Sequence, residues 1–291
     1  MNITEYLRQV YEDFDSYITG GEMLCELKEV SFDQNSLPDY GNIHIQQYYL
    51  LRYAYGYAFE YYTMYEDLFQ KYISSRNISV LSIGCGSGLD AMGLYENAPD
   101  TDRILYTGVD LVNWNYKIFK KGTRYIQKEI NAWLREQEEI AYDIVFFPKS
   151  ISEFDNARLR EIAQLISEKN SKKDLYIMIS LRATEYTLDK DLTKSGVLVN
   201  TFQENGYMFK NGNRAREYIR FTKPDTAIFT LNGRNEYPEE ALELCKTLNE
   251  YCVTYEMDGA NCLECETQRL KRQPILKVGA IKYQIIHLER V

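Results

Sequence analysis

The chain has 291 residues, of which 45% are apolar, and a formal net charge of −9. This length suits one large domain or two modest ones, and the acidic balance disfavours non-specific contacts with nucleic acid phosphates. No window approaches the roughly 20 apolar residues of a membrane helix, and the amino terminus lacks the apolar core of a signal peptide. We therefore expect a soluble, cytoplasmic protein.

The first part of the chain, residues 1–76, is predicted to form a helical cap. Apolar side chains recur at helical spacing from Tyr6 to Ile18, and a loop rich in Asn, Pro and Gly spans 31–42. A long helical stretch follows, in which Gly56 marks a candidate break. Its tyrosines recur every four residues, so they form a row that drifts around the helix axis.

The second part, residues 77–291, is predicted to be an α/β domain. Short β-branched runs alternate with amphipathic stretches, which implies a parallel sheet with helices on both faces. Two later runs are candidates for closing strands, with an antiparallel direction as one option. The predicted strands cover 80–84, 104–111, 123–130, 142–150 and 173–182, followed by 226–231 and 280–291.

A glycine-rich loop follows the first predicted strand in "VLSIGCGSGLD", where Gly84, Gly86 and Gly88 occupy every second position. A sharp turn from strand to helix needs residues without Cβ, and the next helix offers unpaired N–H groups and a positive dipole end. Such loops hold phosphates or carboxylates. The simplest alternative is a tight turn without a ligand.

Two nucleoside cofactors are compatible with this loop. The dinucleotide fingerprint G-x-G-x-x-G/A fits only from Gly86 through Gly88 and Ala91, about two residues late for the end of the strand. The G-x-G-x-G pattern at the strand end instead resembles motif I of the class I S-adenosylmethionine-dependent methyltransferases. The resemblance covers about residues 78–182. It implies a Rossmann-like sandwich with a mostly parallel seven-stranded sheet and an amino-terminal helical cap.

The resemblance also implies which residues hold the cofactor. Asp110 ends the second predicted strand, where a carboxylate accepts hydrogen bonds from both ribose hydroxyls, a role that suits either cofactor. Glu129 and Ile130 match the positions that meet the adenine amino group and ring, although the family more often has Asp there. Cys85 is expected to be a small neighbour of the ligand. The implied cofactor-binding set is Gly84, Cys85, Gly86, Gly88, Asp110, Leu111, Glu129, Ile130 and Phe147.

The fourth predicted strand leads into "PKSISEF", at the sheet edge where ligands bind in open α/β folds. Methyl transfer needs an aligned acceptor, and a general base only where the acceptor carries a proton of high pKa. We predict that Glu153 orients or deprotonates the acceptor, that Lys149 neutralises an anionic group, and that Ser150 assists. The alternative is that Ser150 or Ser152 caps the next helix.

The tyrosine row has two interpretations. The simpler is a helix that covers the sheet and leaves its hydroxyl groups at the edge. The functional one is an aromatic lid or cage for a cationic or flat acceptor, with Tyr49, Tyr53 and Tyr57 as substrate residues. The acceptor is then expected to be a small molecule or a peptide. Cationic runs at 214–223 and 269–272 keep an RNA acceptor open.

Four cysteines near the carboxyl terminus are a candidate zinc site, although two of them share one predicted helix at a spacing typical of buried residues. We assign no metal and no oligomeric state. Two other functions remain open: binding of S-adenosylmethionine or another nucleoside without turnover, and an NAD(P)-dependent oxidoreductase. The cysteines are Cys245, Cys252, Cys262 and Cys265.

Overall fold

The computed structural model describes residues 1–18, 27, 30, 32, 38–74, 77–182, 184–210, 216–221, 236–242, 274–276 and 280–291. The chain divides into two compact units. The first unit comprises Met1–Phe59, Trp114–Tyr116 and Thr226–Val278, and the second comprises Glu60–Asn113, Lys117–Asp225 and Gly279–Val291. None of the described helices is long and apolar enough to cross a membrane.

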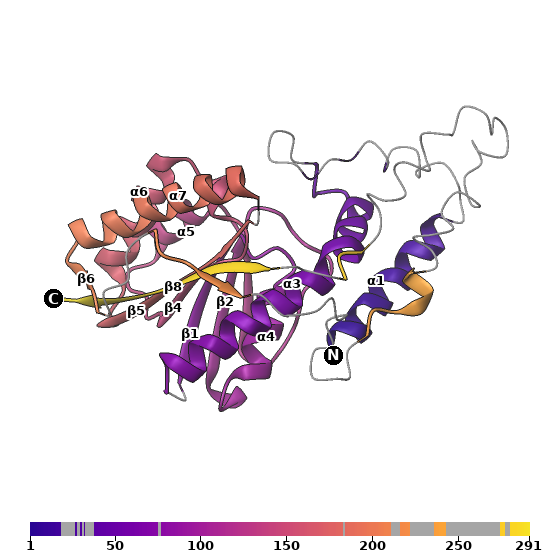
Figure 1. Cartoon of the computed structure of the whole chain (residues 1–291), viewed down its shortest axis with the longest axis horizontal. Helices are drawn as coiled ribbons and strands as arrows, with labels where there is room; N and C mark the ends of the chain where they lie inside the picture. The colour runs from indigo at the N-terminus through magenta and orange to yellow at the C-terminus, as the bar shows by residue number, and fades with distance from the viewer. Residues whose placement is uncertain are drawn as a thin grey trace. The chain divides into compact units, whose positions relative to one another are not determined.

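The second unit contains an eight-stranded sheet with the order β3-β2-β1-β4-β5-β8-β6, and β7 pairs with β8 (Figure 1). Strands β1 to β5 are parallel, while β8 runs antiparallel to its three neighbours β5, β6 and β7. This confirms the predicted Rossmann-like, mostly parallel sheet, although the two short strands β6 and β7 were not predicted. The strands are β1 (Ile78–Ile83), β2 (Ile104–Asp110), β3 (Thr123–Gln127), β4 (Ile144–Phe147), β5 (Asp174–Leu181), β6 (Tyr207–Phe209), β7 (Ile219–Phe221) and β8 (Ile281–Arg290).

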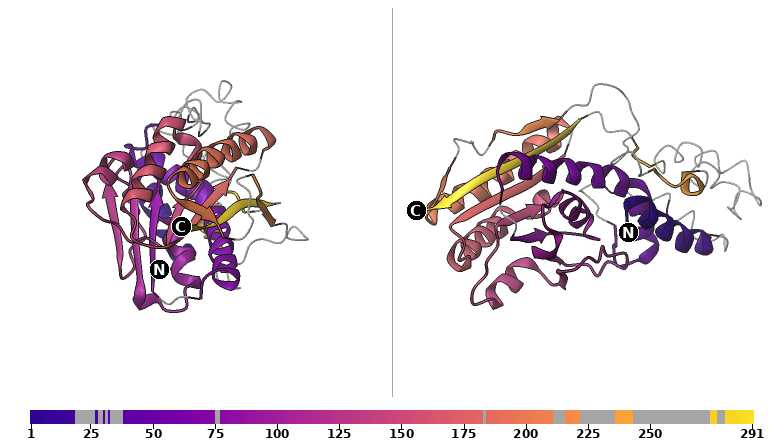
Figure 2. Two further views of the ribbon diagram at one scale, coloured as in Figure 1. Left: turned by 90° about the vertical axis from the view of Figure 1, so that its left-hand side faces the viewer. Right: turned by 90° about the horizontal axis from the view of Figure 1, so that it is seen from below.

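Helices cover both faces of this sheet (Figures 1 and 2). Helices α5 (Ile130–Glu136), α6 (Asn156–Lys169) and α7 (Glu185–Glu204) pack on one face. Helix α4 (Leu89–Asn97) and the carboxyl-terminal part of α3 (Ile43–Lys71) lie on the other. Two short 3₁₀ turns, η1 (Thr101–Arg103) and η2 (Ile151–Glu153), complete the connections.

Strand β4 shows how the sequence produces these two layers. Successive side chains of a strand point to opposite faces of the sheet. Phe147 therefore joins the apolar cluster beneath α5, α6 and α7, whereas Phe146 makes edge-to-face contacts with Tyr61 and Tyr65 of α3. Because both faces are buried, β4 is a continuous apolar run instead of an alternating one.

The first unit contains α1 (Ile3–Ile18) and the amino-terminal part of α3. The candidate break at Gly56 was wrong, since α3 is continuous through this residue. A Cβ at Gly56 would lie 3.2 Å from the carbonyl oxygen of Ile275, so the glycine allows a close approach of another segment. The glycine is therefore explained by the close packing of Ile275 against this point of the helix.

Other elements also differ from prediction. The fourth strand covers only Ile144–Phe147 of the predicted 142–150. The third strand ends at Gln127 and not at residue 130, because Glu129 already caps α5 by accepting a hydrogen bond from the amide of Ala132. Helix α7 was not predicted; Thr184 caps it by accepting a hydrogen bond from the amide of Thr187. The strand expected at 226–231 lies outside the described residues.

Candidate functional site

The glycine loop adopts the backbone conformation that its sequence predicts. Strand β1 ends at Ile83, and Gly84, Gly86 and Gly88 follow with φ angles of 67°, 55° and 77°. This left-handed region is costly for residues with a Cβ. A Cβ at Gly88 would also lie 2.2 Å from the hydroxyl oxygen of Tyr125, so side-chain clash and backbone strain both require glycine there.

Asp110 ends β2 directly opposite this loop. One of its carboxylate oxygens, Oδ2, accepts a hydrogen bond of 2.7 Å from the amide of Gly86, and the other accepts one of 2.8 Å from the amide of Val112. These bonds fix the carboxylate at the carboxyl edge of the sheet, next to the point where the chain order reverses between β1 and β4. In open α/β sheets ligands bind at such a point.

A small hollow that is open to solvent, with about 180 Å³ of empty space, lies beside this carboxylate. This volume includes open solvent, so the hollow is shallow and gives room for only one part of a larger ligand. Its wall combines the loop after β1 with the ends of β2 and β3. The lining residues are Cys85, Gly86, Gly108, Asp110, Val112, Lys117, Tyr125, Ile126 and Gln127.

Sequence reasoning missed six residues of this wall, which are Gly108, Val112, Lys117, Tyr125, Ile126 and Gln127. Gly108 lies inside β2, and a Cβ there would come within 2.7 Å of the Cys85 sulfur, so a glycine inside a strand was an available signal. Lys117 donates a hydrogen bond of 2.7 Å to Asn113 and lies over the Tyr125 ring. No local pattern marks Lys117, because its position depends on the path of the loop between β2 and β3.

The Cys85 side chain is buried at the floor of the loop. Burial raises the pKa of its thiol well above the ordinary value, and the nearby carboxylates of Asp110 and Asp90 add to this. Nucleophilic cysteines need a lowered pKa. Cys85 therefore fits the predicted role of a small residue next to a ligand.

The other predicted cofactor residues, which include the two adenine contacts Glu129 and Ile130, have mixed surroundings. Glu129 accepts a hydrogen bond of 2.8 Å through Oε2 as the cap of α5, which holds its carboxylate in a fixed place beyond β3. Ile130 and Phe147 are buried in the core cluster, whereas Leu111 is 70% exposed beside Asp110. Of these three apolar side chains, only that of Leu111 is accessible to a ligand, while those of Ile130 and Phe147 pack in the core that supports the sheet.

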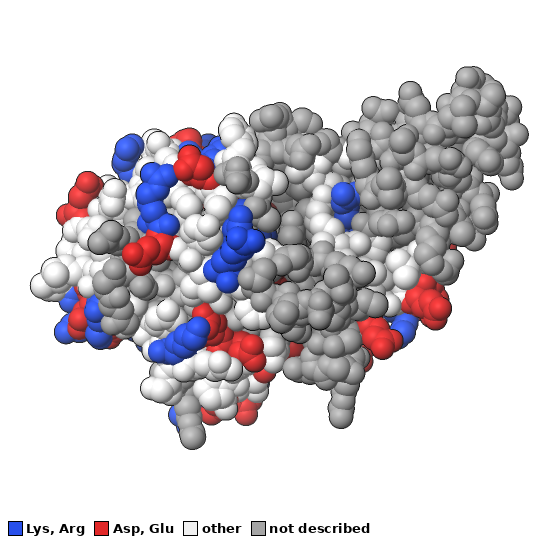
Figure 3. Space-filling model, in the orientation of Figure 1, with Lys and Arg blue, Asp and Glu red and all other residues white. Residues whose placement is uncertain are grey.

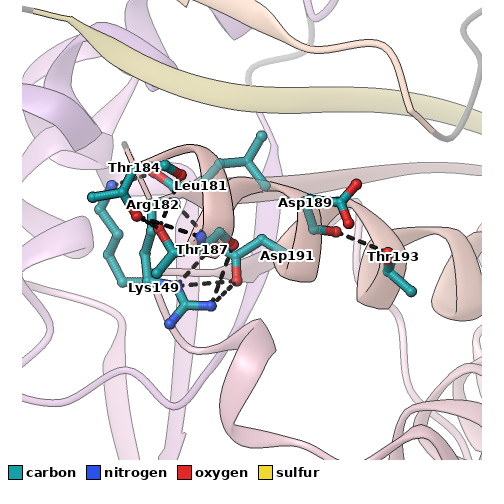
Figure 4. A network of polar contacts seen from close by, with 8 residues as sticks. All are labelled: Lys149, Leu181, Arg182, Thr184, Thr187, Asp189, Asp191 and Thr193. Atoms are coloured by element: carbon teal, nitrogen blue, oxygen red, sulfur yellow. Dashed lines mark hydrogen bonds and ion pairs between the residues drawn. The ribbon is translucent and has the colours of Figure 1, made fainter. Parts of the chain in front are cut away.

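The turn after β4 contains Lys149, whose φ of 62° is the one left-handed angle among described residues other than glycine. Its ammonium group lies 2.7 Å from a carboxylate oxygen of Glu60 and donates a hydrogen bond of 2.6 Å to the carbonyl of Leu181, the contact drawn in Figure 4. Both charged side chains are largely buried. The charge of Lys149 thus pairs within the protein, and the substrate role predicted for Lys149 stays a prediction.

Ser150 is also used internally. Its hydroxyl donates a hydrogen bond of 2.5 Å to the carbonyl of Ile83, and the residue is 2% exposed. Ser150 does occupy the cap position of the 3₁₀ turn η2, with Glu153 in its first turn, but its side chain makes no capping hydrogen bond there. Helix α6 is capped by Asp155, which accepts a hydrogen bond from the amide of Arg158.

Glu153 lies at the exposed rim of the same edge. The surrounding protein disfavours its charged form, and with the nearby Asp110 carboxylate this raises its pKa to about 7, against an opposing effect of Arg182. Since water still reaches Glu153, solvent screening limits the size of this shift. A carboxyl group that titrates near neutral pH is suited to general acid–base work.

Arg182 follows β5, and its guanidinium group forms a two-pronged ion pair with the buried carboxylate of Asp191 (Figure 4). The amide of Arg182 donates to the same carboxylate at 2.9 Å. This pair fixes the start of α7 against the end of β5. The Arg182 guanidinium is therefore committed to Asp191, and it also donates to the carbonyl of Thr187.

A buried carboxyl group lies behind the glycine loop. Asp90, in the first turn of α4, is 0% exposed and accepts a hydrogen bond of 2.9 Å from the Tyr106 hydroxyl. Its second oxygen, Oδ2, is buried without a hydrogen-bond partner among the described residues. Burial raises the pKa of Asp90 to about 7.

The tyrosine row forms an aromatic cluster within the first unit. The rings of Tyr53 and Tyr57 stack with 5.6 Å between centroids, and Tyr49 contacts Tyr53 at 5.1 Å and Trp114 at 5.6 Å. These three tyrosines are half-buried. Their role as an acceptor lid stays a prediction.

Surface charge does not form a broad basic patch on the described part of the face in Figure 3, where Lys and Arg are interspersed with Asp and Glu. Within the first cationic run, Arg216 pairs with Asp189 at 2.7 Å. Arg214, Lys223 and the run at 269–272 lie outside the described residues, as do Cys245, Cys252, Cys262 and Cys265.

No family model matches the chain, and no curated protein matches it by sequence. Among solved structures, the plantazolicin methyltransferase BpumL, in complex with a monoazolic desmethylPZN analog and SAH, is 14% identical with a TM-score of 0.44, and the match covers 98% of each chain. A SAM dependent methyltransferase from Archaeoglobus fulgidus is 17% identical with a TM-score of 0.39, over 79% of this chain and 94% of the other.

The [4+2]-cyclase SpnF is 9% identical with a TM-score of 0.39, and the match covers 79% of this chain and 81% of the cyclase. Many of the solved structures that resemble the chain are S-adenosylmethionine-dependent methyltransferases of the class I fold, at low sequence identity.

Proposed function

We propose that the second unit binds S-adenosylmethionine at the glycine loop and transfers its methyl group to an acceptor. One observation carries the proposal: three left-handed glycines follow β1 directly, and the amide of the middle one is held by the carboxylate that ends β2. This arrangement brings bare backbone next to a fixed acceptor of ribose hydrogen bonds. A plain tight turn would not need the carboxylate.

The cofactor residues follow from this geometry. Asp110 would accept hydrogen bonds from the ribose hydroxyls, since its carboxylate lines the hollow and a carboxylate accepts several hydrogen bonds. Gly84, Gly86 and Gly88 would allow close approach to the loop, and Leu111 and Glu129 would flank the adenine. Lys117 joins this set because it lines the same hollow.

A dinucleotide is the competing ligand, because Asp110 suits both. Its fingerprint requires the first glycine as the strand ends. In this chain that glycine is Gly84, which breaks the fingerprint because residue 89 is Leu. The register from Gly86 would place the first glycine three residues after Ile83. The position of the strand end thus favours S-adenosylmethionine.

Methyl transfer from a sulfonium is an in-line displacement, for which the protein mainly aligns the acceptor and excludes water. S-adenosylmethionine supplies the activated methyl group when bound. Within this chain, Glu153 is the candidate general base, since its raised pKa lets it accept a proton near neutral pH. Lys149 and Ser150 have internal partners and are reassigned to support of the β4 turn. We infer a small molecule or a peptide as the acceptor, which fits the acidic chain.

Calorimetric titration with S-adenosylmethionine, S-adenosylhomocysteine, NAD and NADP tests the cofactor. We expect micromolar binding of S-adenosylmethionine and S-adenosylhomocysteine and no binding of the dinucleotides. The variant Asp110→Ala should lose binding of both sulfur compounds. Binding of a dinucleotide alone would overturn the proposal. If the sulfur compounds bind but radiolabelled methyl is never transferred to any member of a broad acceptor panel, the alternative of binding without turnover is favoured.

A further inference from the structure

The turn after β4 is held by a buried ion pair that no local sequence pattern predicts. Lys149 and Glu60 are separated by 88 intervening residues, and their side chains are 16% and 5% exposed. Ser180 of β5 donates a hydrogen bond to the same carboxylate of Glu60. Figure 4 shows the second contact of Lys149, which donates a hydrogen bond to the carbonyl of Leu181. The pair therefore ties α3, the β4 turn and β5 together.

Lys149 needs such support because its backbone is in the left-handed region. A residue with a Cβ persists in this conformation only where its surroundings impose it, and such residues concentrate at functional sites. Glycine would adopt the same angles without help. The chain instead uses a lysine whose ammonium group is anchored at two points.

The consequence is the position of the next residue. The Ser150 hydroxyl donates to the carbonyl of Ile83, the last residue of β1. The missing Cβ of Gly84 faces Ser150 so closely that a Cβ would lie 2.6 Å from that of Ser150. The turn after β4 therefore packs directly against Gly84, the first glycine of the glycine loop.

We propose that the buried Glu60–Lys149 ion pair is a positioning device that holds Lys149 left-handed, so that Ser150 supports the Gly84 turn in the geometry that binds the cofactor. This inference rests on the proposed function for its readout, which is cofactor affinity. It assigns no contact between Lys149 and the cofactor or the acceptor.

Two double variants separate positioning from general stabilisation. Glu60→Gln with Lys149→Met removes both charges, so no unpaired charge stays buried, but it keeps a Cβ at position 149. Glu60→Gln with Lys149→Gly also removes the pair but supplies a residue that turns left-handed freely. At metal sites, residues that orient the direct ligands change affinity about 10- to 100-fold when mutated, and we take the lower end of that range as the guide here. We expect the methionine variant to bind S-adenosylhomocysteine about tenfold more weakly. The glycine variant should stay within about threefold of wild type.

Calorimetry on folded protein, checked by circular dichroism and thermal melting, decides between the outcomes. Rescue by glycine, or folding of the glycine variant alone, supports the proposal. Equal affinity of both variants, folding of the methionine variant alone, or failure of both to fold overturns it. If wild type binds neither sulfur compound, the proposed function fails by itself. The melting midpoints of the two double variants then still test whether the ion pair holds Lys149 left-handed. The glycine variant is expected to melt several degrees higher than the methionine variant.

Discussion

The two halves of the sheet's carboxyl edge use polar groups in different ways. Around β1 and β2, the Asp110 carboxylate is held by backbone amides beside an open hollow. Around β4 and β5, the charged groups of Lys149 and Arg182 pair with the buried carboxylates of Glu60 and Asp191. The first half is the one that we propose binds a ligand, while the charged groups of the second half hold its own turns in place. Substitutions in the two halves should consequently differ in what they change.

The largest effect is expected for Gly88→Ala in the first half. Its Cβ would be 2.2 Å from the Tyr125 hydroxyl oxygen at a φ of 77°. Left-handed strain of about 1–2 kcal/mol and overpacking of about 1–3 kcal/mol add together. We expect loss of measurable S-adenosylhomocysteine binding by calorimetry, and a drop in unfolding free energy by urea titration.

Gly206→Ala is the matched control for this variant. Gly206 has a φ of 86°, but nothing lies within 4 Å of its Cβ position. The unfolding free energy of Gly206→Ala should fall only by the left-handed strain of about 1–2 kcal/mol, and its cofactor affinity should stay unchanged. Equal binding by Gly88→Ala and wild type would show that the loop does not hold the ligand.

A smaller effect is expected for Asp110→Asn. Hydrogen bonds to charged groups contribute about 1.5–3 kcal/mol each, so loss of the charge should weaken S-adenosylhomocysteine binding by about 10- to 100-fold. Asp191→Asn, in the other half, should instead lower the unfolding free energy, because Arg182 loses its charged partner. If both variants changed affinity alike, the distinction between the two halves would be wrong.

The first half was predictable because its requirements are local. Three glycines and an aspartate at the end of the next strand follow from short stretches of sequence, and Gly108 carried the same kind of signal without being used. The second half was not predictable, because the Glu60–Lys149 pair joins residues distant along the chain. Helix α7 was missed for a related reason. Its many threonines and valines and its Gly196 give weak intrinsic propensity, so packing of buried residues such as Leu198 and Phe202 stabilises it.

The layer beneath the first half supplies a pH-dependent prediction. The pKa of Asp90 is raised to about 7 in the folded protein by burial, so its contribution to stability is present below about pH 4 and is lost as the pH rises through 7. Between about pH 5.5 and 8, wild type should lose about 2 kcal/mol more unfolding free energy than Asp90→Asn. Urea titration at both pH values measures this difference.

Asp102→Asn is its control, because it removes the same charge from a side chain that is 74% exposed. This variant should follow the wild-type pH dependence closely. A wild-type curve parallel to that of Asp90→Asn would mean that Asp90 is ionised in the folded protein throughout this range.

The smallest effect concerns Glu153, where the two halves meet. The surrounding protein and the Asp110 charge raise its pKa to about 7, so deprotonation adds negative charge to the edge as the pH passes 7. S-adenosylmethionine carries a positive sulfonium, whereas S-adenosylhomocysteine has a neutral sulfur. Only the affinity for S-adenosylmethionine should therefore rise when Glu153 loses its proton. Because the attraction acts across solvent, the ratio of the two affinities should rise by about threefold between about pH 6 and 8. Glu153→Gln should abolish this rise, while Glu138→Gln, at an exposed position, should keep it. A rise that persists in Glu153→Gln would assign the titration to another group and would remove Glu153 as the candidate base.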